Sequence, residues 1–274
     1  MRASTRPWRG RFPAVLLAAV LALPLSAMGA FPAGAADPTA IGLVPAGQTM
    51  FTFVGKIDQN GTLADDVGYL TSVAGLDEGL LFVGGDPLSR TESTARLTYF
   101  ASAKLLTRSI NGNVFITSGT AETTLYLSRG GASFDDPASF KSGEAIATFQ
   151  SRWQDIVNVQ SPNKGVATVT SDETQRTAST FTLGGAQYLF GRAGLRFRLN
   201  VAGEGTRTDP TAPRASILYG GNAVPLPQAG LPAPSAATGG TSGWAYAGFG
   251  VGIAALVVAL GSLAMARRGR AASV

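Results

Sequence analysis

Three pairs of adjacent acidic residues are the side chains of this sequence that best suit a hard metal ion: Asp65-Asp66, Asp77-Glu78 and Asp135-Asp136. Calcium takes about six to eight oxygen ligands, usually from alternating positions of one loop. Adjacent acids do not give that spacing, and no D-x-D-x-D-G pattern occurs. We therefore interpret the pairs as solvated turns, as expected where Asp136 precedes Pro137. We predict no metal site and no cofactor, with calcium as the alternative.

A second group combines arginine with aromatic residues: Arg192, Arg196 and Arg198 lie close in sequence to Phe190 and Phe197. Arg196 and Arg198 share one face of a predicted strand and could clamp an anionic ligand. Alternating arginines are more common on the wet face of an antiparallel strand, and we favour that interpretation.

Single carboxylates are the remaining candidates for chemistry. Asp155 or Glu144 could act as a base inside a barrel cavity, but a lone carboxylate is nearly always an ordinary surface charge. The chain has no histidine and no cysteine. This absence excludes Ser-His-Asp triads, cysteine nucleophiles and His-Cys zinc sites. We therefore assign no catalytic residue, and we expect stability to be nearly constant between pH 5 and 8 unless the pKa of a carboxylate is strongly shifted.

The net charge of +5 does not indicate nucleic-acid binding, because the excess is confined to the two ends. Seven basic residues flank the chain: Arg2, Arg6, Arg9, Arg11, Arg267, Arg268 and Arg270. The other 15 Lys and Arg residues share the central section with all 17 Asp and Glu residues, so that section is close to neutral.

Between Met50 and Tyr219, short runs rich in β-branched and aromatic residues alternate with turn residues, as in half-buried strands. In 96–106, for example, Leu97, Tyr99 and the following alternate residues share one face. The predicted strands are 50–57, 96–106, 113–117, 121–127, 145–159, 165–171, 179–183, 187–190, 194–202 and 216–219. Asn60-Gly61 and Asn111-Gly112 are predicted hairpin turns. The pattern predicts an all-β domain, either a single antiparallel β-barrel or a β-sandwich.

Two stretches resemble allene oxide cyclase and dirigent-type β-barrels. The first is Phe51–Gly61 with Gly68-Tyr69, which is similar to the opening of those barrels. The second is Gly184-Gly185 followed by 190–194, which resembles their double-glycine hairpin and the arginine-containing strand after it. The resemblance implies an eight-stranded barrel with a central cavity, and no functional residue is transferred from it.

The N-terminal segment, residues 1–36, is predicted to be a signal peptide. A basic, acid-free start precedes the short apolar run 13–25, and small residues follow at 33–35. Residues 37–224 are then the all-β extracytoplasmic domain.

The C-terminal segment is predicted to anchor the protein in a membrane. Residues 225–243 form a Pro/Gly/Ala/Ser linker, Trp244–Ala266 is a charge-free transmembrane helix that contacts the lipid bilayer, and 267–274 is a basic cytoplasmic tail. Gly248 and Gly252 have the spacing of a weak helix-mediated dimer, although glycine is common in membrane helices. The layout also resembles a bacterial cell-wall sorting signal, but 235–239 has serine where that family has leucine, so we favour membrane retention.

These features predict a membrane-anchored, single-pass bacterial surface protein. Its β-domain would be a non-catalytic binding or structural module with an extracellular ligand or protein partner. The alternative is a cofactor-free barrel enzyme or a carrier of a small lipophilic ligand, and a third option is an accessory subunit of a membrane complex. A filled interior would favour a structural role, whereas an open apolar pocket with converging polar groups would favour a ligand or a substrate.

Overall fold

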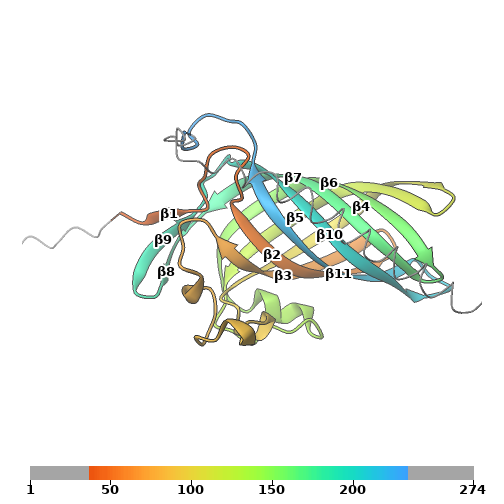
Figure 1. Ribbon diagram of the computed structural model, residues 1–274, viewed down its shortest axis with the longest axis horizontal. Coiled ribbons are helices and arrows are strands. Elements are labelled where there is room, and N and C mark those ends of the chain that lie inside the picture. Colours follow the sequence, from red (N-terminus) through yellow and green to blue (C-terminus); the bar gives the residue numbers. More distant parts are fainter. Residues whose placement is uncertain (1–36, 234–274) are drawn as a thin grey trace, which may run out of the picture. The chain divides into compact units, whose positions relative to one another are not determined.

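A computed structural model describes residues 37–233, which form a closed antiparallel barrel of eight strands (Figure 1). The strand order around the barrel is β10-β11-β2-β3-β4-β5-β6-β7. The bounds are β2 Phe51–Asn60, β3 Leu63–Val73, β4 Leu97–Asn111, β5 Val114–Leu127, β6 Glu144–Ser161, β7 Lys164–Ala178, β10 Arg196–Asp209 and β11 Arg214–Pro225. Closure pairs every barrel strand on both edges. The all-β prediction is confirmed, and of its two forms the barrel is the correct one.

Most predicted strands are present, but they are longer than the sequence pattern indicates. The runs 113–117 and 121–127 belong to one strand, β5, because Gly119 pairs in register with Leu105 of β4. No strand is predicted over β3, whose Asp65-Asp66 pair and Gly68 are residue types that strands usually avoid. The short strand β1 (Thr39–Ile41) is also not predicted.

The hairpins β2–β3, β4–β5, β6–β7 and β10–β11 all turn at the same end of the barrel, which we call the rim. Gly61 and Gly112 have φ of +67° and +58°, so the two predicted Asn-Gly turns are confirmed. β3 pairs with β4 only as far as Lys104, and β4 continues to Asn111. The β4–β5 hairpin therefore projects beyond the β2–β3 hairpin.

A three-stranded sheet, β1-β9-β8, lies at the opposite end of the barrel (Figure 1). It contains β8 (Thr180–Leu183) and β9 (Ala186–Phe190), joined by Gly184-Gly185 with φ of +60° and +84°. The fully buried Phe190 of β9 packs against Phe51 and Phe149, with ring centroids 5.7 and 6.2 Å apart. This aromatic packing closes the barrel at that end, which we call the floor.

Two long connections carry the short 3₁₀ helices η1 (Glu78–Leu80), η2 (Pro87–Ser89), η3 (Glu92–Thr94) and η4 (Pro137–Lys141). The connection with η4 packs on the outer face of β3 and β4, where Val67, Ala132 and Phe140 form a small buried cluster. This cluster is separate from the lumen. The uncovered outer wall also carries exposed apolar side chains, among them Ile116, Ile156 and Leu218.

Several predicted features lie outside the described residues: the signal peptide 1–36, the helix 244–266 with Gly248 and Gly252, and the tail 267–274. Of the predicted linker 225–243, residues 225–233 are described, and Gln228 exchanges two hydrogen bonds with the backbone of Arg196. Within residues 37–233 no helix has the length and apolar character needed to cross a membrane.

Candidate functional site

The barrel lumen contains a cavity of about 160 Å³ that reaches from the floor to Thr62 and Leu63 at the rim. Alternate residues of each strand face inward, so all eight barrel strands contribute to the lining. Most of the lining is aliphatic or aromatic, with few polar groups. The principal side chains are Phe51, Phe53, Ile57, Asp66, Leu70, Tyr99, Leu105, Leu125, Phe149, Ser151, Trp153, Asp155, Val169, Ser171, Glu173, Phe190, Phe197, Leu199, Val201, Ile217 and Tyr219.

Glycines in the wall make room for the large rings of the lumen. Gly55 of β2 and Gly68 of β3 are cross-strand partners, and both lie against the hydroxyl of Tyr99. Gly55 also lies against the hydroxyl of Tyr219. A Cβ atom at either glycine would collide with these hydroxyls. The glycine pair therefore permits two tyrosines to meet against the wall.

Tyr99, Tyr219 and Asp66 form a continuous hydrogen-bonded chain inside the barrel. The two hydroxyl oxygens are 2.6 Å apart. The Tyr219 hydroxyl donates to Oδ1 of Asp66, so it accepts the hydrogen bond from the Tyr99 hydroxyl. Burial raises the pKa of Asp66 to about 7, against the lowering effect of the Tyr219 hydrogen bond, and the charge of Glu173 raises it further. The pKa values of both tyrosines are also raised, mainly by burial and to a smaller extent by the charge of Asp66. Their hydroxyls therefore remain protonated at neutral pH.

Glu173 of β7 is the second acid of the lumen, and only 5% of its surface is exposed. The Ser171 hydroxyl donates to its Oε1 at 2.8 Å, while Oε2 has no hydrogen-bond partner among the described residues. Burial raises the pKa of Glu173 to about 7, although the hydrogen bond from Ser171 acts in the opposite direction. The side chain thus presents an unsatisfied oxygen to the cavity.

Trp153 and Asp155 of β6 lie nearer the rim. The indole of Trp153 stacks over Gly119 of β5, where a side chain would overlap the ring. Trp153 Nε1 and Asp155 Oδ1 are both buried without a partner in the described part of the chain. Burial raises the pKa of Asp155 to about 6. A donor and an acceptor are therefore both available to a molecule in the lumen.

The rim carries exposed apolar side chains on two of its hairpins. Leu63 and Ile110 are both more than half exposed, and Phe115 lies beneath the guanidinium of Arg108, 5.0 Å from the ring centroid. The entrance thus carries exposed apolar side chains, and the guanidinium of Arg108 is stacked on its projecting hairpin.

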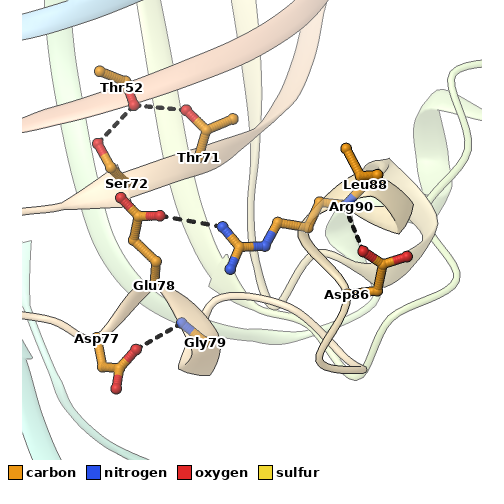
Figure 2. Close-up of polar contacts among 9 residues, drawn as sticks. All are labelled: Thr52, Thr71, Ser72, Asp77, Glu78, Gly79, Asp86, Leu88 and Arg90. Carbon is orange, nitrogen blue, oxygen red and sulfur yellow. Dashed lines mark hydrogen bonds and ion pairs between the residues drawn. The ribbon is translucent and has the colours of Figure 1, made fainter.

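The predicted site residues separate into inward and outward groups. Asp65 faces outward, but Asp66 faces the lumen, so the interpretation of that pair as a solvated turn is wrong: the pair lies within β3. The other two pairs do lie in turns. Asp77 accepts a hydrogen bond from the backbone N–H of Gly79, and Glu78 pairs with Arg90 at 3.1 Å (Figure 2).

The turn formed by Asp135-Asp136 has the same construction, because Asp136 accepts from the backbone N–H of Ala138. Among the described residues, no group of three acidic side chains is close enough to hold a metal ion.

The arginine cluster is on the outside, as the favoured interpretation predicts. Arg196 and Arg198 are exposed, and Arg198 pairs with Asp172 of the neighbouring strand. Arg192 donates through Nη2 to the backbone carbonyl of Ala229. None of the three lines the lumen.

Of the two single carboxylates, Glu144 is exposed at the start of β6, whereas Asp155 is 9% exposed and lines the cavity. The interpretation of Asp155 as a surface charge is therefore wrong. Glu173 is not a candidate in the sequence analysis at all. The run around it, TVTSDETQRT, is polar on both faces, so alternation alone does not show which side is inside.

Comparisons with known proteins return nothing for this chain: no protein-family model, no curated protein and no solved structure matches it. The assignment of a function therefore depends on the chemistry of the lumen itself.

Proposed function

We propose that the domain binds a small, largely apolar molecule in the barrel lumen and acts as a receptor or carrier for it. The observation that supports this most strongly is the cavity of about 160 Å³, apolar over most of its lining and supplied with a few unpaired polar groups. Ligand sites characteristically combine an apolar concave surface with a small number of orienting polar groups. A purely structural barrel would gain stability by filling this space.

The size of the cavity limits the part of the ligand that can be buried. An engineered cavity of about 150 Å³ is known to hold one benzene molecule. The lumen thus suits a single six-membered ring or a short aliphatic chain, and a longer ligand would extend past Leu63 at the rim.

The test uses a variant that fills the lumen and a matched variant that does not. Ala101 lines the cavity, whereas its neighbour Ser102 faces outward and is exposed. Toluene should raise the Tm of the wild-type protein and of Ser102→Leu, because a ligand that binds only the folded state stabilises it. The same toluene concentration should give no shift with Ala101→Leu. An equal shift in all three proteins would contradict binding in the lumen.

Acid–base catalysis without a cofactor is a second candidate, favoured by Asp66 and Glu173, which face one lumen with pKa values of about 7. A carboxylate with a pKa close to the working pH is well suited to accept and return a proton. Deuterium exchange into the α-carbon of cyclopentanone in D₂O would reveal such an activity. It should disappear in Glu173→Gln and persist in Asp172→Asn.

We further propose that the domain is exported and held at the membrane by Trp244–Ala266. The support is the charge-free apolar length of that segment and the three arginines after it. Protease added to intact cells should remove the barrel and leave a short protected C-terminal fragment. Deletion of 244–266 should release the barrel into the medium, while Thr238→Ala should leave it attached. Release by Thr238→Ala would instead indicate sorting to the cell wall.

A further inference from the structure

The lumen contains three carboxyl groups and no basic group. Its titratable side chains are Asp66 from β3, Tyr99 from β4, Asp155 from β6, Glu173 from β7 and Tyr219 from β11, and the cavity-facing residues of β2, β5 and β10 add none. Arg108 lies beyond the cavity, stacked on Phe115, and is not part of the lining.

Two of these carboxyl groups are incompletely hydrogen-bonded although they are more than nine-tenths buried. Oε2 of Glu173 and Oδ1 of Asp155 have no partner within residues 37–233. A buried carboxylate without a partner is costly, so the empty lumen lacks a compensating donor or cation. A positively charged ligand with N–H groups would supply both.

The surroundings of Glu173 suit an organic cation better than a metal ion. Its cross-strand neighbour Phe197 belongs to the aromatic floor, and the rings of Phe51 and Phe149 lie within 6 Å of the Phe197 ring, centroid to centroid. Aromatic faces attract ammonium groups. A metal ion would need several acids at one place, but the acids are spread along the lumen. Glu173 pairs across the strands with Ser151 of β6. Asp155 lies four residues further along β6 toward the rim, which is roughly 13 Å from Ser151.

We propose that the ligand is a small organic ammonium ion, bound with its N–H groups on Oε2 of Glu173 and its hydrocarbon part along Val169, Val201 and Ile217 toward the rim. Asp66 faces the same space and adds a second negative charge, and Asp155 attracts the cation at the entrance. This inference rests on the proposed binding function and specifies the ligand's charge.

Benzylammonium and benzyl alcohol are the probes that isolate the effect of charge, since they share one ring and one methylene. Isothermal titration of the full-length protein at pH 8 should give an affinity for benzylammonium that is at least about tenfold higher than for benzyl alcohol, as expected for a buried charge pair. The affinity for benzylammonium should fall at pH 5, where the lumen carboxyls are protonated. The affinity for benzyl alcohol should remain within about twofold, because it carries no charge.

The matched variants are Glu173→Gln and Asp172→Asn, which remove one negative charge from adjacent residues of β7 that face opposite sides of the wall. Glu173→Gln should weaken benzylammonium binding at least about tenfold and leave benzyl alcohol binding unchanged. Asp172→Asn should change neither. The two variants have the same net charge, so general attraction of cations to the protein is controlled.

Three outcomes would overturn the inference. Equal affinity for the two probes would show that the lumen binds a neutral ligand, which leaves the proposed binding function intact. Equal weakening by Glu173→Gln and Asp172→Asn would place the cation on the outer surface. Binding of neither probe, together with no effect of toluene on Tm, would remove the proposed binding function itself.

Discussion

Asp172 and Glu173 are neighbours in β7, yet they face opposite sides of the barrel wall in opposite electrostatic settings. Asp172 accepts two hydrogen bonds from Arg198, at 2.7 and 3.0 Å, and the Arg198 hydrogen bond lowers the pKa of Asp172. Within residues 37–233 Glu173 forms no ion pair, and burial raises its pKa. The charge of Asp172 on the outer wall is thus compensated by Arg198, whereas that of Glu173 in the lumen has no such partner among the described residues. Uncompensated buried groups lower stability, which is typical of a functional site rather than a structural core.

Two other pairs of adjacent residues also differ between the outer and the inner face of the wall. Asp65 is exposed outside β3, while Asp66 joins the tyrosine chain inside it. Gly220 faces outward from β11 into open space, whereas Gly221 faces inward against the ring of Phe53. Each pair provides an experiment in which one substitution has a matched control at the next position.

The largest expected effect is on the pH dependence of stability, and it concerns Glu173. Its pKa rises on folding from 4.5 to about 7, so the folded state binds more protons than the unfolded state in that window. Stability is therefore greatest below pH 4.5, decreases as pH rises to about 7 and is constant above. The rise in the pKa of this one group therefore lowers the free energy of unfolding by about 3 kcal/mol between pH 4.5 and pH 8.

Glu173→Gln removes this loss. The variant should match the wild type near pH 4 and exceed its free energy of unfolding by about 3 kcal/mol at pH 8, as measured by urea denaturation. Parallel pH profiles for the two proteins would show that Glu173 has an ordinary pKa. Asp66 and Asp155 shift the wild-type profile in the same direction. Three carboxyl groups with raised pKa values are therefore the exception to the nearly constant stability between pH 5 and 8 that the absence of histidine predicts.

A smaller effect is expected at the glycines of β11. An added Cβ at Gly221 would lie 2.6 Å from the backbone oxygen of Asn200 and 2.7 Å from the Phe53 ring, whereas at Gly220 its nearest neighbour would be 3.7 Å away. Gly221→Ala should lower the free energy of unfolding by about 1–3 kcal/mol, as overpacking of a core does. Gly220→Ala should be neutral or slightly stabilising. Equal effects in urea denaturation would contradict the inward position of Gly221.

These contrasts also show how far the sequence predicts the structure. Where the inner face is apolar, as in Leu97, Tyr99, Ala101 and the alternate residues after them, the period of two identifies both the strand and its buried side. The same alternation, together with the Asn-Gly turns, accounts for the all-β prediction, but it does not distinguish a barrel from a sandwich. The fold class is therefore predictable from local patterns, whereas closure into a barrel depends on the pairing of distant strands.

The site is less predictable because polar residues inside the lumen interrupt the pattern that identifies strands. β3 is not predicted since Asp65, Asp66 and Gly68 are typical of turns, and two of them are required by the tyrosine chain. The sequence identifies Asp155 as a candidate acid, but it does not show that the side chain is buried. Burial of a single carboxyl depends on the register of eight strands, and one residue of slip would place it outside.

The smallest expected effect belongs to the outer member of the first pair. Arg198 and Asp172 are both exposed, so their ion pair is screened by solvent, and Arg198→Ala should cost only about 0.5 kcal/mol at low salt. The sign of its pH dependence is opposite to that of Glu173. The pKa of Asp172 is lowered from 3.8, so its contribution to stability is present above pH 3.8 and is lost as pH falls through the lower folded value.

A double-mutant cycle of Arg198→Ala and Asp172→Asn, measured by urea denaturation at low salt and at 1 M salt, isolates the interaction energy of the pair. The coupling should be small at low salt and vanish at 1 M, because the screening length there is about 3 Å. A coupling above about 2 kcal/mol, or one that persists at high salt, would mean that the outer wall is as strongly coupled as the lumen and would remove the contrast between the two faces.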